Sequence, residues 1–118
     1  MNNTKELVEG LAQMIKEGKM LEAFEKYYAD NVSMQENDEA PRVGKEVNRA
    51  FEKTFVEGIT EFHSAEILGT ASNDNYSMIE SSMDVTHKDW GRIARTQVAV
   101  QRWENNQIIK EKFYYGTK

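Results

Sequence analysis

The sequence predicts an α+β domain in which three helices pack on one face of a curved antiparallel sheet. Apolar residues in the first half of the chain recur at helical spacing, whereas from Ile59 onward they alternate with a period of two. The strand-like runs of the second half are separated by short polar clusters, which is typical of antiparallel hairpins. The length of 118 residues fits a single domain over residues 1–118.

Three amphipathic helices are expected before the strands. The first ends at Gly18, a residue type that favours helix C-termini, and its apolar stripe is Leu7, Leu11, Met14 and Ile15. The second ends near Asp30, and its apolar face is Leu21, Phe24, Tyr27 and Tyr28. The third begins after Gly44, and its stripe is Val47, Ala50, Phe51 and Phe55. A short extended segment at 32–35 and an acidic loop at 36–41 separate the second helix from the third.

Four strands are expected after the helices, at residues 60–70, 76–87, 92–103 and 108–115. In the last strand, Lys110 and Lys112 alternate with Glu111 and Phe113. Because lysines belong in water, the alternation directs Glu111 inward. An inward carboxylate costs stability unless it is paired, hydrated or functional, so Glu111 becomes a candidate site residue.

The strand expected at residues 92–103 has two plausible inner faces. Simple alternation would place Val98 and Val100 in the core and leave Gln97 and Gln101 in solvent. A sheet covered by helices on one face and by a second subunit on the other would bury both sets. Residues 76–87 show the same division. We therefore expect a homodimer that forms through the sheet.

The composition excludes several classes of protein. The formal net charge of -5 argues against a nucleic-acid partner, which requires a basic face. No run approaches the roughly 18 apolar residues of a membrane span, so no membrane partner is expected. The chain has no cysteine, and its two histidines, His63 and His87, lack ligand spacing, so no metal site is expected.

Two further expectations follow from what the sequence lacks. The first residues do not show the basic-then-apolar order of a signal peptide, which favours a cytoplasmic location. The seven glycines are dispersed and form no phosphate-cradling loop, so no cofactor is implied.

Several short motifs, taken in order, resemble a known family. They are Tyr-Ala-Asp-Asn at 28–31 before Val-Ser-Met at 32–34, Pro-Arg-Val-Gly at 41–44, Gln-Arg-Trp at 101–103, and Phe-Tyr-Tyr-Gly at 113–116. Together the motifs resemble the nuclear transport factor 2-like superfamily, in particular its SnoaL-like and ketosteroid isomerase-like branch. The resemblance implies a cone in which the sheet wraps around the helices and leaves a pocket at its open end. It also implies pairing of two copies through the outer sheet face.

The resemblance assigns roles only where this sequence has suitable residues. Ketosteroid isomerases use a carboxylate base, and the corresponding position here is Glu36. The family's two donors to the enolate oxygen fall on Leu11 and Ala99, which cannot donate. Ketosteroid isomerase activity itself is therefore not expected, because such donors contribute a few kcal/mol each to transition-state stabilisation.

The candidate catalytic residues are Glu36 and Glu111, and both have structural alternatives. Glu36 begins an acidic run that would be a solvated loop, and Glu111 would form an ion pair with an arginine such as Arg95. The candidate ligand-binding residues are Met34, Met78, Glu80, Gln97, Gln101, Trp103, Phe113 and Tyr115.

Two functions are favoured at this point, and a third class, a pure interaction or scaffolding protein, has no basic patch or obvious peptide groove to support it. One is carboxylate-mediated proton transfer on a hydrophobic carbonyl compound, as the resemblance to SnoaL-like cyclases implies. The other is a non-catalytic binding module for a small hydrophobic or amphipathic metabolite, which the residues at Leu11 and Ala99 favour. The sequence does not identify the substrate.

Overall fold

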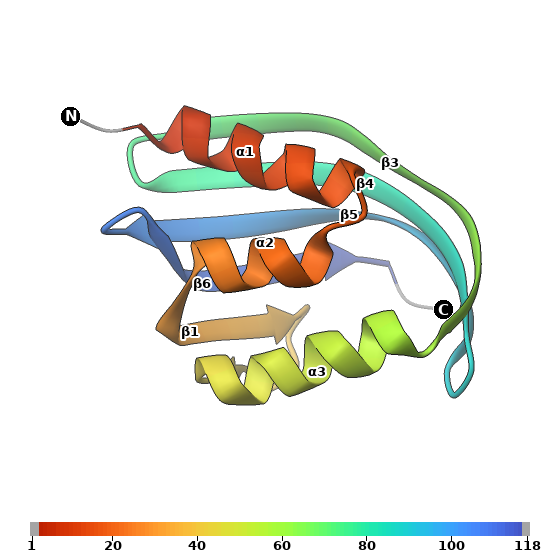
Figure 1. The fold of residues 1–118 in the computed structure, drawn as a ribbon. Helices are drawn as coiled ribbons and strands as arrows, with labels where there is room; N and C mark the ends of the chain where they lie inside the picture. The colour runs from red at the N-terminus through yellow and green to blue at the C-terminus, as the bar shows by residue number, and fades with distance from the viewer. Residues whose placement is uncertain (1–2, 117–118) are drawn as a thin grey trace.

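The computed structural model describes residues 3–116 and has the expected α+β architecture (Figure 1). Its helices are α1 Thr4–Lys16, α2 Met20–Tyr27 and α3 Lys45–Glu57. Its strands are β1 Tyr28–Glu36, β2 Arg42–Val43, β3 Ile59–Asn73, β4 Tyr76–His87, β5 Gly91–Glu104 and β6 Gln107–Tyr115. None of the helices within 3–116 is long and apolar enough to cross a membrane.

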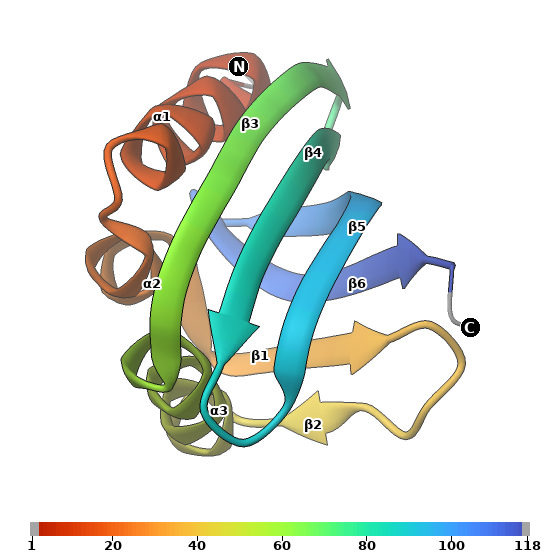
Figure 2. The ribbon, with the colours of Figure 1, turned by 90° about the vertical axis from the view of Figure 1, so that its right-hand side faces the viewer.

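The six strands form one mixed sheet in the order β2-β1-β6-β5-β4-β3 (Figure 2). Strands β3 to β6 form the expected antiparallel meander, but β1 lies parallel to β6, so the expectation of a wholly antiparallel sheet was incomplete. Parallel strands need a long connection, and here β2, α3, β3, β4 and β5 lie between β1 and β6. The sheet is not closed, since β2 and β3 are its two edges.

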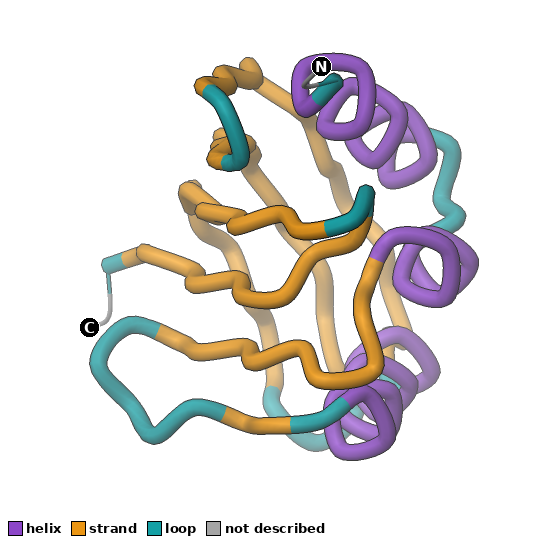
Figure 3. Tube along the Cα trace, turned by 90° about the vertical axis from the view of Figure 1, so that its left-hand side faces the viewer, coloured by secondary structure: helices purple, strands orange, loops and turns teal. Residues whose placement is uncertain are grey.

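All three helices lie on the same side of the sheet (Figure 3). Helix α1 packs on β3 and β4, whereas α3 packs on β1 and β2. The long strands β3, β4 and β5 bend round toward the C-terminal end of α3, which makes the helix side concave (Figure 1). The core between these layers consists of Val8, Leu11, Ala12, Ala23, Phe24, Tyr27, Tyr28, Val32, Met34, Ile79, Trp103 and Ile108.

The glutamine face of β5, rather than its valine face, points into the concave side. Gln101 is fully buried, whereas Val98 and Val100 lie on the outer face and are only half-buried. The reason is the register with β6, which places Gln101 opposite the inward Glu111. Partners in an antiparallel pair share a face, so the lysine pattern of β6 fixes the orientation of β5.

Two expectations for the helices are corrected. The second helix ends at Tyr27 rather than near Asp30, and Tyr28 opens β1. The third helix is rotated from its expected stripe, because Val47 is 53% exposed while Asn48 is completely buried.

Asn48 explains this rotation, because it ties α3 to β1 and β2. Its amide nitrogen Nδ2 donates to the carbonyl oxygens of Arg42 and Gly44, both at 2.9 Å, and of Val32 at 3.5 Å. Its Oδ1 accepts from Nε of Arg42 at 3.1 Å. A buried amide with this many partners determines the helix orientation more strongly than an exposed valine does.

His87 contacts the C-terminal end of α3. Its Nε2 lies 3.0 Å from the carbonyl oxygen of Thr54, and its Nδ1 accepts from the backbone N–H of Asp89 at 3.1 Å. The ring lies directly over Gly58, where a Cβ would come within 2.1 Å of Nε2. These contacts give His87 a structural role at the β4–β5 turn.

Asn48→Ala should lower the free energy of unfolding by about 2–3 kcal/mol, because it removes the side-chain hydrogen bonds by which this fully buried amide joins α3 to Val32, Arg42 and Gly44. Urea denaturation measures the change. Asn31→Ala, at an exposed position on β1, is the matched control and should stay within about 0.5 kcal/mol of the wild type. Equal effects of the two substitutions would contradict the role assigned to Asn48.

Candidate functional site

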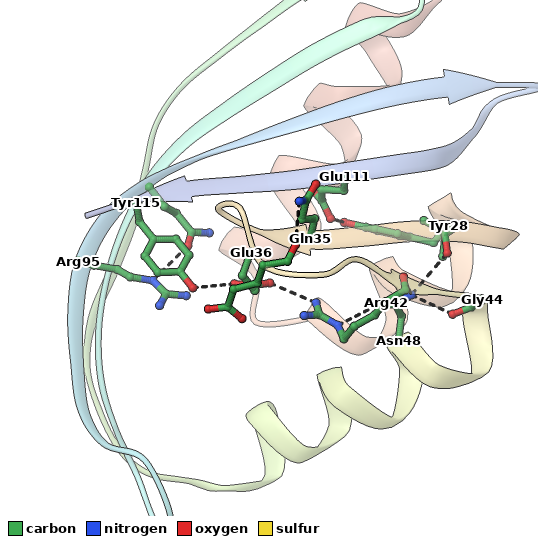
Figure 4. Close-up of polar contacts among 12 residues, drawn as sticks. Tyr28, Gln35, Glu36, Arg42, Gly44, Asn48, Arg95, Glu111 and Tyr115 are labelled. Atoms are coloured by element: carbon green, nitrogen blue, oxygen red, sulfur yellow. Dashed lines mark hydrogen bonds and ion pairs between the residues drawn. The ribbon is translucent and has the colours of Figure 1, made fainter. Parts of the chain in front are cut away.

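The concave side contains a buried carboxylate, Glu111, at the middle of β6. Tyr28 on β1 donates its phenolic O–H to Oε1 at 2.5 Å, and Gln101 on β5 donates Nε2–H to Oε2 at 2.7 Å (Figure 4). Within residues 3–116 Glu111 has no ion pair, so the alternative of a pair with Arg95 is wrong.

A chain of hydrogen bonds continues from Glu111 across the sheet. The Oε1 of Gln101 accepts from Oγ of Ser77 on β4 at 2.7 Å, and Nε1 of Trp103 donates to the same Oγ at 2.8 Å. Trp can only donate and an ionised carboxylate can only accept, so the direction of every bond in the chain is fixed while Glu111 is ionised. No buried side-chain N or O atom within 3–116 lacks a partner.

Helices leave part of the concave side uncovered. We call it the open region, and it comprises the inward-facing residues that are only partly buried: Ser81, Met83, Arg95, Gln97, Phe113 and Tyr115. The neighbouring inward positions Ile79, Ala99 and Gln101 are buried, and Val85 and His87 are buried at the α3 end. The open region therefore lies between two covered parts of the sheet.

Glu36 lies at the end of β1 beside the open region, and both of its carboxylate oxygens are engaged. Tyr115 donates its O–H to Oε1 at 3.0 Å, and Nη2 of Arg42 lies 3.1 Å from Oε2 (Figure 4). The guanidinium of Arg42 also stacks on the ring of Phe51, 3.7 Å from its centroid. Glu36 is thus an oriented, ion-paired carboxylate rather than part of a solvated loop.

A third carboxyl group, Glu52 on α3, joins this site. It lies one helical turn after Asn48 and is half-buried. It is close enough to Glu111, Arg42 and Glu36 for their charges to act on it. Within residues 3–116 it has no hydrogen-bond or ion-pair partner, in contrast to Glu36 and Glu111.

The two interior carboxyl groups hold their protons more tightly than ordinary ones. Burial raises the pKa of Glu111 to about 7, against the opposing effect of its hydrogen bonds from Gln101 and Tyr28. Burial and the neighbouring Glu111 carboxylate raise the pKa of Glu52 to about 8. Burial and Glu111 also raise the pKa of Tyr28, which keeps its phenol protonated. The site therefore contains carboxyl groups that titrate near neutral pH.

The structure brings most of the predicted site residues together. Those on the concave side are Met34, Glu36, Gln97, Gln101, Trp103, Glu111, Phe113 and Tyr115. Met78 and Glu80 lie on the outer face, because they alternate with the inward Ser77 and Ile79. Leu11 and Ala99, the positions of the absent donors, are both buried in the core.

Two surface hollows lie elsewhere. One, of about 160 Å³, is on the outer sheet face and is lined by Gln35, Tyr76, Val100, Arg102, Lys110, Lys112 and Tyr114. The other, of about 490 Å³, lies beside the start of α3 and is lined by Asp30, Val43, Gly44, Lys45, Glu46, Val47 and Arg49. Neither is lined by Glu36, Glu52 or Glu111.

Sequence reasoning missed Tyr28, Arg42 and Glu52. Tyr28 looked like the last residue of a helical apolar face, and its phenol gives no separate signal in the sequence. Glu52 was overlooked because the helix was placed on its Val47 face. Glu52 is four residues after Asn48, so the two residues share one face of the helix. This spacing becomes informative only once Asn48 is known to point inward.

A profile of the SnoaL-like domain matches residues 2–115 of the chain. The chain belongs to the SnoaL-like domain family. No functionally curated protein matches the sequence.

Solved structures agree with the fold of this SnoaL-like domain. A candidate SnoaL-like polyketide cyclase from Mesorhizobium loti is 28% identical, with a TM-score of 0.86 over 96% of this chain and 99% of the other. A second candidate cyclase of this type, from Jannaschia, is 10% identical, with a TM-score of 0.77 over 94% and 85% of the two chains.

A more distant structure contains a ligand. It is a ketosteroid isomerase-like protein from Catenulispora acidiphila in complex with trimethylamine. It is 16% identical, with a TM-score of 0.66 over 81% of this chain and 75% of the other. At this identity the likeness concerns the fold only.

The SnoaL-like domain should lose stability as the pH rises from about 5 to 8. Glu52 and Glu111 have folded pKa values of about 8 and 7, above the ordinary 4.5, so each binds its proton more tightly in the folded state. Their stabilising effect is complete below pH 4.5 and disappears as the pH rises through 7 and 8. Urea denaturation at pH 5, 6.5 and 8 measures this slope.

Glu52→Gln should make the slope shallower, since only Glu111 then contributes. Glu57→Gln, at an exposed position on the same helix, is the control and should retain the wild-type slope. A slope in Glu52→Gln identical to that of the wild type would show that Glu52 does not hold a proton more tightly on folding.

Proposed function

We propose that this SnoaL-like domain catalyses proton transfer on a small amphipathic carbonyl compound bound at the open region. Glu36 acts as the carboxylate base, and protonated Glu52 donates to the carbonyl oxygen. The observation that carries the proposal is Glu52, a half-buried carboxyl group with a pKa of about 8 and no hydrogen-bond partner within 3–116. A carboxyl group that is neutral at pH 7 is a hydrogen-bond donor.

The three carboxyl groups of the site suit different roles. Glu111 is fully buried with both oxygens engaged, so it is poorly placed to contact a ligand. Burial and the negative charge of Glu111 together raise the pKa of Glu52. Glu36 is ion-paired with Arg42, and its side chain is 14% exposed, which leaves it partly open to a ligand.

The proposed reaction conserves atoms and charge. The proton on the carbon next to the carbonyl moves to the Glu36 carboxylate, and the electron pair of the C–H bond delocalises onto the carbonyl oxygen. Glu52 stabilises the resulting enolate by hydrogen bonding. Glu36 then returns the proton to a carbon atom, so that both groups end in their starting states.

Glu52 takes the place of the two hydrogen-bond donors that ketosteroid isomerases have at the positions of Leu11 and Ala99. A donor supplied from α3 rather than from α1 and β5 would approach the carbonyl oxygen from another side. Support for the alternative, a non-catalytic binding module, comes from Glu36, whose two oxygens already have partners in Tyr115 and Arg42.

Exchange of α-protons for deuterium tests the reaction without knowledge of the product. Cyclohexanone and 2-octanone in D2O serve as probes, and NMR measures the loss of the α-proton signals. The wild type should accelerate exchange over buffer. Glu52→Gln should reduce the acceleration roughly 100-fold or more, as the loss of an oxyanion donor does.

Glu36→Gln should abolish the acceleration, because an amide cannot accept the proton. Glu57→Gln on the exposed side of α3 should behave as the wild type. Full activity in a Glu36→Gln/Glu52→Gln double variant would refute the mechanism. Binding of the ketones by the wild type without any exchange would favour the binding module.

The proposal includes pairing of two copies through the outer sheet face. Support comes from apolar side chains that remain accessible there, namely Tyr76, Met78, Val98, Val100 and Tyr114. These apolar side chains lie among Arg102, Lys110 and Lys112 on the same face, and accessible apolar groups rimmed by polar ones are typical of an interaction surface.

Val98→Lys should convert a dimer into a monomer, because it places a charge in the centre of the paired face. Light scattering after size-exclusion chromatography measures the mass. Val47→Lys is the control, since Val47 is 53% exposed on α3, which lies on the opposite side of the sheet. A wild-type protein that is monomeric at every concentration tested would disprove the pairing.

A further inference from the structure

Arg95 is a half-buried cation on the concave side that has no acidic partner. Arg42, Arg49 and Arg92 each lie within 4.0 Å of a carboxylate oxygen. Within residues 3–116, Arg95 forms no ion pair, although its side chain is in the open region. A partly desolvated charge without a counter-charge is costly, which distinguishes Arg95 from an arginine on the outer surface.

Two contacts hold the Arg95 guanidinium in place. Its Cζ lies 3.8 Å from the centroid of the Tyr115 ring, and its Nε donates to Oε1 of Gln97 at 3.2 Å (Figure 4). The stacking uses one flat face and the hydrogen bond uses Nε. Neither terminal nitrogen has a partner within 3–116, so the two NH2 groups that form the fork remain available.

Gln97 supplies another available donor. Because an arginine nitrogen can only donate, the Gln97 atom that contacts Nε must be its oxygen. This assignment leaves the Gln97 amide N–H groups, which have no partner within 3–116, beside the guanidinium. The open region thus contains a cluster of donors fixed before any ligand arrives.

The charges around Arg95 favour a ligand with one negative charge. The nearest acidic group across Tyr115 is Glu36, which accepts from the Tyr115 O–H at 3.0 Å. Glu36 is already paired with Arg42 at 3.1 Å, so it is not the ion-pair partner of Arg95. A planar guanidinium fork matches the two oxygens of a carboxylate.

We propose that Arg95 and Gln97 bind the carboxylate of a small amphipathic carboxylic acid at the open region. The apolar body of the acid lies against Phe113 and Met83, which are partly exposed on the same face. This inference rests on the proposed function, because it names the class of substrate that places a carbonyl group between Glu36 and Glu52. The opposing hypothesis is that Arg95 only supports Tyr115.

Matched eight-carbon probes test the head group. Octanoate, octanamide and octyl phosphate share one chain and differ in charge, and isothermal titration calorimetry measures their dissociation constants. The wild type should bind octanoate at least about tenfold more tightly than octanamide, since a charge-assisted bidentate pair is stronger than neutral hydrogen bonds. It should also prefer octanoate to octyl phosphate.

Arg95→Gln should remove the preference for octanoate over octanamide. Arg102→Gln is the matched control, because Arg102 also stacks on a tyrosine, Tyr76, at 4.9 Å, but lies on the outer face. It should retain the preference. The proposal is overturned if Arg95→Gln keeps the preference, if Arg102→Gln loses it, or if wild-type protein binds octanamide as tightly as octanoate or prefers octyl phosphate.

A measurement on the wild type covers the case in which Arg95→Gln does not fold. Octanoate should shift the Nε–Hε NMR signal of Arg95 and leave that of Arg102 unchanged. The reverse pattern, or no shift in either signal, overturns the proposal.

The ketone exchange experiment separates this inference from the proposed function. A clear octanoate preference without α-proton exchange leaves the carboxylate site in place and refutes the catalysis. Exchange of neutral ketones by a protein that lacks the preference refutes the carboxylate site and leaves the catalysis in place.

Discussion

The burial of the Glu111 carboxylate is the constraint on which the rest of the concave side depends. A carboxylate can lie in the interior only if donors reach both of its oxygens, and these come from Tyr28 and Gln101. Each donor is on a neighbouring strand, so both strands must be in register with β6. A shift of one residue would turn every inward side chain of β5 outward and leave Glu111 unsatisfied.

The hydrogen-bond chain also explains why polar residues displace valines from the interior. Ser77 and Trp103 complete the bonds of Gln101, so no member of the chain is left without a partner. A fully satisfied buried network stabilises one arrangement, whereas a partly satisfied one is less stable than an apolar core. Val98 and Val100 can lie on the outer face, because the proposed pairing would cover that face with the apolar surface of a second copy.

The fold class and the inward direction of Glu111 were predictable from local patterns. The helical and strand periods identify the elements, and Lys110 and Lys112 settle the orientation of β6. The orientation of β5 was not predictable from its own alternation, because both of its faces contain residues that a core accepts. The register that pairs Gln101 with Glu111 decides which face of β5 points inward, and this register depends on the tertiary structure.

The site residues on α3 were beyond prediction for a similar reason. The direction of Glu52 follows from Asn48, whose buried amide hydrogen-bonds to the backbone carbonyls of Val32, Arg42 and Gly44. Nothing in the spacing of Val47 and Phe51 reports those bonds. Helix propensity and apolar stripes describe a helix alone, whereas here side-chain hydrogen bonds to the neighbouring segments set its rotation.

Under the two proposals, the charge of a ligand bound at Arg95 and the protonation of Glu52 would be coupled. A carboxylate bound at Arg95 would add a negative charge beside Glu36 and on the same concave side as Glu111. Further negative charge favours the protonated form of a neighbouring carboxyl group, so Glu52 would remain a donor to higher pH when the ligand is present. Coupling of this kind is reciprocal, and protonated Glu52 would therefore strengthen binding of the anion. The ligand would thus help to establish the protonation state that acts on its own carbonyl group.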